Sequence, residues 1–425
     1  MSGPAEEEGK LRRDIGFSGS AILSFNGAVG AGIFALPALL FAQFGAFSPW
    51  LFPIFGLLVL AIALPFARLA SLFPQSGGPV AYTAAFGPLA SFQVGWVYYV
   101  ARVTALAANS NVFATYAANL WAPLGGGAGR AMLIAALCGL LTWINVAGVR
   151  RAIRALDAIT ILKAAPVVGV ALAGLILFAG QVPAPGPAPA LSGIEAAALL
   201  VLYAFVGFEN SVIPAGETAD PRRTIPRALI ATIVAIAALY FLVQLAYVTV
   251  RPEGNEAPLI ALGAALAGPA GALLMTFAAL FSIAGNATSS LTSTPRVTFA
   301  LARDGLLPGW FGRVSARFGT PANSILFMGL AGAALAISGS FVWLAVVSTL
   351  ARLIVYSACI AALPAAERKA SGRTALAIPA AAIGLIVCLW AALQSDWPAW
   401  RMLLGLIALG LVLYALARRE AVRRG

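Results

Sequence analysis

An interrupted apolar segment near the amino terminus constrains the fold more than any other feature of this chain. Residues 16–41 are apolar enough to cross a membrane, yet Gly27, Gly30 and Gly32 lie close together within them. Glycine destabilises a helix by about 1 kcal/mol relative to alanine, and backbone groups released from a helix at membrane depth are tolerated only where they line an enclosed cavity. We therefore expect a broken helix whose free amide groups face a ligand, and such amides suit a carboxylate.

The composition places the whole chain in a membrane. Hydrophobic residues make up 61% of the 425 residues, charged residues only 10%, and the mean hydropathy is +0.93, which exceeds the values of water-soluble domains. Apolar runs long enough to span a bilayer recur along the chain. We predict an all-α integral membrane protein that forms one transporter domain over residues 1–425, with about twelve transmembrane helices. The predicted spans are 16–41, 47–72, 88–117, 130–149, 156–180, 193–217, 227–249, 270–301, 322–338, 341–363, 375–394 and 398–416.

The positive charge of the chain is explained by topology. The net charge of +12 could suggest nucleic acid, but most lysine and arginine residues fall in alternate loops between the predicted spans. This asymmetry is typical of the positive-inside rule. We expect a multi-pass protein of the cell (inner or plasma) membrane with both termini in the cytoplasm, lipid as its surroundings, and no nucleic-acid partner.

The residues of redox, metal and hydrolytic chemistry are scarce. The chain has no histidine, and Cys138, Cys359 and Cys388 sit singly in apolar runs. No hydrolase or kinase signature is present, and the glycine cluster follows no predicted strand, so it is not a phosphate loop. We expect no metal, no cofactor and no enzymatic activity.

A second interruption falls in the sixth predicted span. Residues 203–209 place Gly207 and the ionisable Glu209 midway along it. Two broken helices in corresponding positions of two five-helix halves are typical of an inverted-repeat transporter, whose site lies where the repeats meet. Carbonyl groups near Val206 and Phe208 would then accept hydrogen bonds from an ammonium group. The alternative is that the glycines only allow helices to pack closely.

Five motifs, in this order, resemble those of the amino acid-polyamine-organocation superfamily of permeases. They are residues 30–34 with Pro37, 74–82 with 86–88, 205–209, 217–227, and 302–308 with 319–321. The resemblance implies the leucine-transporter fold, with helices 1 and 6 broken, a 5+5 inverted repeat and two extra helices. Residues 1–180 would hold the first repeat and the amino-terminal tail, 193–363 the second repeat, and 375–416 the extra helices. It also implies amino acid transport by alternating access.

The resemblance assigns the substrate site to the two breaks. The implied substrate-binding residues are Ala28, Val29, Gly30, Ala31 and Gly32 in the first span and Tyr203, Phe205, Val206 and Phe208 in the sixth. Asn26 is a further candidate. Tyr203 stands where the family carries a large aromatic residue over the substrate, although it could equally belong to the core.

Lys163 is a candidate for energetic coupling, because an ammonium group inside a span is costly unless it is paired, hydrated or neutral. In sodium-independent members of the resembled family a lysine at this place occupies the region where relatives bind sodium. Lys163 would then contact the first break and hydroxyl groups of span eight, with Ser289, Ser290 and Thr292 as candidates. Two interpretations remain open: a lysine that sheds and regains a proton during the cycle, and a fixed structural cation.

Two arginines lie deep within predicted spans, far from their ends. Arg102 is 14 residues beyond Pro88, roughly 21 Å along a helix and close to the expected depth of the substrate. It could recognise an anionic side chain, but pairing with Glu209 or with a helix C-terminus is favoured, because intramembrane ions seek partners. Arg352 is expected to have the same structural purpose.

These observations predict a secondary active transporter of amino acids. We expect it to be sodium-independent and to work by proton-coupled symport or by exchange, so protons join the amino acid as candidate partners. A polyamine or other organic cation is the alternative substrate class, although polyamines lack the carboxylate that the first break suits. A channel is disfavoured because no span carries a regular polar stripe. The sequence leaves the oligomeric state open.

Overall fold

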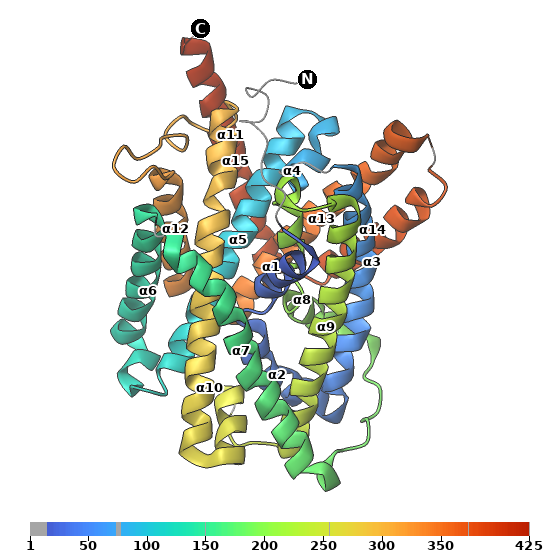
Figure 1. Cartoon of the computed structure of the whole chain (residues 1–425), viewed down its shortest axis with the longest axis vertical. Coiled ribbons are helices and arrows are strands. Elements are labelled where there is room, and N and C mark those ends of the chain that lie inside the picture. Colours follow the sequence, from blue (N-terminus) through green and yellow to red (C-terminus); the bar gives the residue numbers. More distant parts are fainter. Residues whose placement is uncertain (1–14, 74–77, 149, 255, 373, 425) are drawn as a thin grey trace.

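Long helices that run side by side make up the structure (Figure 1). The computed structural model describes residues 15–73, 78–148, 150–254, 256–372 and 374–424, and of residues 150–163, 371 and 421–424 it describes only the helical backbone. The α-helices are α1 (Phe17–Ala28), α2 (Gly32–Phe44), α3 (Leu51–Leu72), α4 (Pro79–Tyr82), α5 (Pro88–Ala117), α6 (Gly127–Ala147), α7 (Arg150–Leu177), α8 (Leu191–Tyr203), α9 (Pro221–Val250), α10 (Pro258–Ser293), α11 (Pro295–Arg303), α12 (Ala322–Ser338), α13 (Phe341–Ser371), α14 (Ala377–Leu393) and α15 (Trp397–Arg424).

The helices agree closely with the sequence prediction. Each of the twelve predicted ranges contains an α-helix, and the first and sixth are interrupted as expected. Within the described part, seven helical segments are long and apolar enough to cross a membrane, and three shorter apolar helices accompany them. The chain is therefore a helical membrane protein, while the number of twelve crossings and the 5+5 repeat stay predictions.

One helix was not predicted. The eighth span was expected to begin at residue 270, but α10 begins at Pro258 and bends sharply at Ala267 and Gly268, where φ of the glycine is +57°. Residues 258–266 therefore form a helix of their own before the span. Pro269, which follows the bend, favours a helix start because it has no amide hydrogen to leave unpaired.

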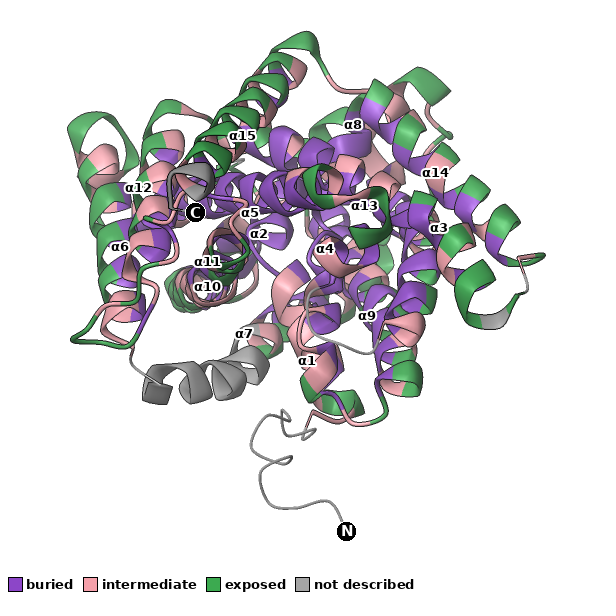
Figure 2. Cartoon of the chain, turned by 90° about the horizontal axis from the view of Figure 1, so that it is seen from above, coloured by how far each residue is buried: buried purple, intermediate pink, exposed green. Residues whose placement is uncertain are grey.

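The central helix α5 is mostly buried and carries several buried polar residues. Of its 30 residues 24 are buried, among them Arg102, Asn109 and Asn111. Seen from above, α5 and α13 lie at the buried centre, whereas α6, α12, α14 and α15 expose one side (Figure 2). Those sides carry large exposed apolar residues such as Leu330 and Leu393, as expected for contact with lipid. The polar groups of α5 therefore face other helices.

The two interrupted spans are joined at one end by backbone hydrogen bonds. Ile15, just before α1, donates its amide to the carbonyl of Glu217 over 3.0 Å and accepts from the amide of Ala219 over 2.9 Å. This pairing holds the start of the first span beside the end of the sixth. The two breaks consequently lie next to each other within the bundle.

Candidate functional site

The first break lies between Ala28 at the end of α1 and Gly32 at the start of α2. The first amides of a helix have no partner within it, and here the amide of Ala31 donates to Oδ1 of Asn109 over 2.8 Å. On the other side of the break, Nδ2 of Asn286 donates to the carbonyls of Asn26 and Gly27, over 2.8 and 3.2 Å. Neutral side-chain amides from α5 and α10 thus hold this break.

The two asparagines are also bonded to each other. Nδ2 of Asn109 donates to Oδ1 of Asn286 over 2.9 Å, so one connected network satisfies both ends of the break. Neither residue was predicted from the sequence. Their signal was present, because each is a side-chain amide inside a predicted span, where an unpaired polar group is costly.

The second break is a turn between Tyr203, the last residue of α8, and the 3₁₀-helix η6 (Phe208–Val212). Gly207 has a φ of +113°, a conformation that favours glycine. Its amide donates to Oε2 of Glu209 over 2.8 Å. The carboxylate of Glu209, two residues further along the chain, therefore closes the turn.

Glu209 belongs to a buried charged network. Its Oε1 lies 3.2 Å from Nε of Arg352, and its Oε2 accepts from the hydroxyl of Tyr356 over 2.8 Å. Arg352 also donates to Ser348 and to the carbonyl of Ala101. Arg102 was expected to pair with Glu209 or with a helix C-terminus; Glu209 pairs with Arg352 of α13 instead, whereas Ser290 and Thr294, which Arg102 contacts, lie at the C-terminal end of α10. The structural purpose expected of Arg352 agrees with this pairing.

Arg102 has partners of a different kind. It donates to Thr294 Oγ1 and Asn210 Oδ1, both over 3.3 Å, and to Ser290 Oγ over 3.1 Å. All three acceptors are neutral. Among the described residues, no carboxylate lies within 4.0 Å of this guanidinium group.

The glycines at the breaks do two different things. A Cβ atom built on Gly207 would lie 2.3 Å from the backbone of Gly27, and one on Gly27 would lie 2.5 Å from the carbonyl oxygen of Gly207. This pair lets the two breaks touch through their backbones, as the packing interpretation supposed. A Cβ atom on Gly30 would instead lie 3.1 Å from Asn109 Oδ1 and 3.3 Å from the Asn286 amide, at the edge of a cavity.

A small cavity of about 20 Å³ lies between the breaks. Its lining residues are Gly27, Ala28, Gly30, Ala31, Gly32, Arg102, Ala105, Asn109, Tyr203, Val206, Asn286, Ser290 and Arg352. One water molecule needs about 10–15 Å³ of such space. The conformation is therefore closed, and a larger ligand requires the lining groups to move.

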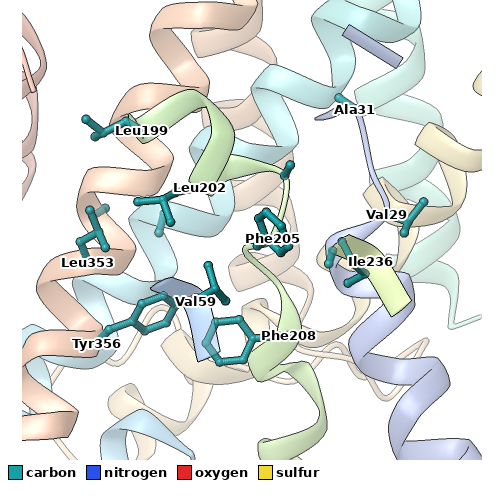
Figure 3. Close-up of a cluster of buried hydrophobic side chains, with 14 of the residues drawn as sticks. Val29, Ala31, Val59, Leu199, Leu202, Phe205, Phe208, Ile236, Leu353 and Tyr356 are labelled. Carbon is teal, nitrogen blue, oxygen red and sulfur yellow. The ribbon is translucent and has the colours of Figure 1, made fainter. Parts of the chain in front are cut away.

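The cavity contains most, but not all, of the predicted substrate-binding residues. Tyr203 and Val206 line it, and the ring of Tyr203 packs edge-on against Phe341 with 5.8 Å between centroids. Phe205 and Phe208 do not line the cavity. Phe205 packs against Tyr240, and Phe208 packs against Phe66 and Tyr356, within the apolar cluster of Figure 3. Val29 belongs to the same core rather than to the cavity lining.

The structure shows the positions of the predicted coupling residues Ser289 and Ser290 but does not describe the side chain of Lys163. Ser290 is buried at the cavity, but its hydroxyl oxygen accepts a hydrogen bond from Arg102. Ser289 does not line the cavity, and Thr292 donates to Asn145 over 2.6 Å. The side chain of Lys163 lies outside the described residues, so its predicted contacts stay a prediction. Among the residues that the structure describes, no group of three or more histidine, cysteine or carboxylate side chains comes together as a metal site would.

Comparison with known proteins agrees with this architecture. A family model described as amino acid permease matches residues 15–414. An uncharacterized transporter of Mycobacterium tuberculosis (strain ATCC 25618 / H37Rv) is 30% identical over 351 residues, which cover 78% of this chain and 76% of that protein. The methylthioribose transporter of Bacillus subtilis (strain 168) is 27% identical over 440 residues, covering 96% and 94%. The D-serine/D-alanine/glycine transporter of Escherichia coli (strain K12) is 26% identical over 345 residues, covering 76% and 72%.

Proposed function

Because the chain belongs to the amino acid permease family of membrane transporters, we propose that it carries an amino acid across the cell membrane by alternating access. The substrate binds in the cavity between the two breaks. The observation that carries this proposal is the pair of adjacent breaks, since residues of both line one cavity and helix ends of opposite polarity suit the two ends of an amino acid.

The first break suits the carboxylate of the substrate. The amides at the start of α2 lie at the positive end of the helix dipole. Among the described residues, the amide of Ala31 has one acceptor, the neutral Oδ1 of Asn109. A carboxylate is a stronger acceptor than an amide oxygen. It can therefore replace Asn109 at this position when the site opens.

The second break suits the ammonium group. The turn after Tyr203 exposes the carbonyl groups of Ala204, Phe205 and Val206, and among the described residues no backbone amide donates to them. Carbonyl oxygens at the end of a broken helix accept hydrogen bonds from a cation. A zwitterionic amino acid would thus lie with one end at each break.

The alternative substrate class, a polyamine or another organic cation, fits the cavity less well. Two buried arginines line it, and Glu209, the carboxylate beside them, is already paired with Arg352. A cation entering this space would meet uncompensated positive charge, which is strongly unfavourable at low dielectric.

The energetic coupling and topology follow the sequence predictions. Transport is sodium-independent, with Lys163 supplying the positive charge beside the first break, and it proceeds either as proton symport or as exchange. The protein lies in the inner or plasma membrane with both termini in the cytoplasm, as the positive-inside asymmetry supports. The two five-helix repeats meet at the cavity.

Uptake into proteoliposomes tests the proposal. The wild-type protein should take up at least one of the twenty amino acids with saturation, and Gly30→Val should abolish this uptake, because its side chain would fill the space beside Asn109 and Asn286. The matched control is Gly139→Val, since Gly139 has nothing within 4 Å of its added Cβ. Full uptake by Gly30→Val, or no uptake of any amino acid by the wild type, would contradict the proposal.

A further inference from the structure

Arg102 is a buried charge that the binding of a zwitterion does not require. It is only 3% exposed and lines the cavity together with the backbone of Gly30 and Gly32. It lies on α5, outside both breaks. The inference below rests on the proposed function and concerns the class of amino acid that is carried.

The surroundings of Arg102 leave its charge poorly compensated. Charge-assisted hydrogen bonds from arginine to a carboxylate are typically 2.7–2.9 Å long, whereas its bonds to Ser290, Asn210 and Thr294 measure 3.1–3.3 Å. The acceptors are two hydroxyl groups and one amide oxygen. Ser290 and Thr294 lie at the C-terminal end of α10, where the helix dipole offers roughly half a negative charge. Among the described residues no full negative charge faces this guanidinium group, which is costly inside a membrane protein.

The charges at the cavity do not sum to zero. Arg102 and Arg352 both line it, and Glu209 is the carboxylate bonded to Arg352. Within the described residues this leaves one positive charge at the site. A ligand of net charge −1 would compensate the charge of Arg102, whereas a zwitterion would not.

We propose that the substrate is an anionic amino acid and that Arg102 binds the carboxylate of its side chain. The planar guanidinium group offers two parallel N–H donors to a carboxylate, and Ser290, already beside it, can donate its hydroxyl hydrogen to the same group. The α-carboxylate binds at the first break and the ammonium at the second. Arg102 is then the residue that determines specificity.

Two pairs of amino acids that differ in charge but hardly in shape provide the test. Aspartate and glutamate are compared with asparagine and glutamine as competitors of tritiated L-glutamate and, in parallel, of tritiated L-alanine, in proteoliposomes of the full-length protein. The wild type should bind each acid about 10- to 100-fold more tightly than its amide, the factor expected for a charged hydrogen-bonded pair.

Variants of Arg102 separate recognition from folding. Arg102→Gln should remove the preference for the acids while changing the affinity for the amides less than threefold, and Arg102→Lys should restore part of the preference because the charge is kept without the planar fork. Arg401→Gln, a change of an exposed arginine on α15, should behave as the wild type. Direct binding measured in detergent reports on variants that no longer transport.

Three results would overturn the inference. Equal affinity for acids and amides in the wild type would show that Arg102 does not recognise the negative charge of the substrate side chain. An equal loss for all four competitors in Arg102→Gln would make Arg102 a structural cross-link between α5 and α10. A strict chloride requirement with neutral substrates would mean that an inorganic anion compensates Arg102. In each of these cases transport of neutral amino acids leaves the proposed function intact, whereas transport of no amino acid at all would overturn both.

Discussion

The two breaks differ in how their released backbone groups are satisfied. At the first break, neutral side-chain amides of Asn109 and Asn286 reach in from two other helices. At the second, the carboxylate of Glu209 bonds the turn itself and is held by Arg352 and Tyr356. Neutral bonds contribute about 1 kcal/mol each, and bonds to charged groups about twice that.

This difference suggests different roles for the two breaks in transport. A ligand carboxylate can compete with an amide oxygen for the first break, so this break can exchange its partners during a transport cycle. The charged network at the second break is completely buried and bonded on several sides. We therefore expect it to keep the turn in place while the first break changes partners.

The largest effect should follow from removing the charge at the second break. Glu209→Gln leaves Arg352 buried without a counter-charge, which we expect to cost about 3–5 kcal/mol of stability and to abolish uptake. Thermal unfolding in detergent measures the loss. Glu253→Gln, at an exposed carboxylate, is the control and should leave the unfolding temperature unchanged. If the Glu209→Gln protein were as stable as the wild type, the charged network would not hold the second break more strongly than neutral bonds hold the first.

The next effect concerns the contact between the two breaks. Gly207→Ala places a Cβ atom 2.3 Å from the backbone of Gly27, at a φ of +113°. We expect a loss of about 2–4 kcal/mol from overpacking and from the unfavourable backbone conformation. Gly139→Ala, in open space on α6, should cause no loss of stability, because alanine favours a helix over glycine. Equal stability of the two variants would mean that the breaks do not need to touch.

Tyr203 should have a smaller, selective effect. It lines the cavity at the end of α8 and packs on Phe341, so Tyr203→Ala enlarges the space around the substrate side chain. We expect discrimination between large and small amino acids to fall about tenfold, the size of a lost apolar contact. Tyr203→Phe keeps the ring and should keep the ranking. An unchanged ranking in Tyr203→Ala, measured by competition, would assign Tyr203 to core packing alone.

The smallest effect expected is that of sodium. If Lys163 supplies the cation beside the first break, replacing sodium by choline should leave uptake within about 20% of its value, because no ion needs to be recruited. Imposed pH gradients then distinguish the two interpretations of Lys163: uptake that rises with an inward proton gradient indicates proton coupling, and gradient-independent exchange indicates a fixed cation. A strict sodium requirement would contradict both.

Much of the fold could be predicted because its signals are local. Apolar runs long enough to cross a membrane located the helices, and the glycines at 27–32 and at 207 located both breaks. The helix at 258–266 was missed because it is too short to give a membrane-spanning signal.

The partners within the site could not be predicted, because they come from distant parts of the chain. Asn109 and Asn286 are 177 residues apart, and Glu209 and Arg352 are 143 apart. The sequence identified the intramembrane charges Arg102, Glu209 and Arg352, but only the packing of α5, α10 and α13 decides which of them meet. Of the two partners expected for Arg102 from the rule that buried ions seek partners, Glu209 pairs with Arg352 instead, whereas the C-terminal end of α10 does contact Arg102.

A structure determined with the transported amino acid bound tests the central claim most directly, namely that the first break exchanges partners while the second does not. We expect the α-carboxylate within hydrogen-bonding distance of the amides at residues 30–33, with the bond from Ala31 to Asn109 broken and the pair of Glu209 and Arg352 unchanged. A ligand bound away from the first break, or a Glu209 that has left Arg352 to hold the ammonium group, would contradict the account.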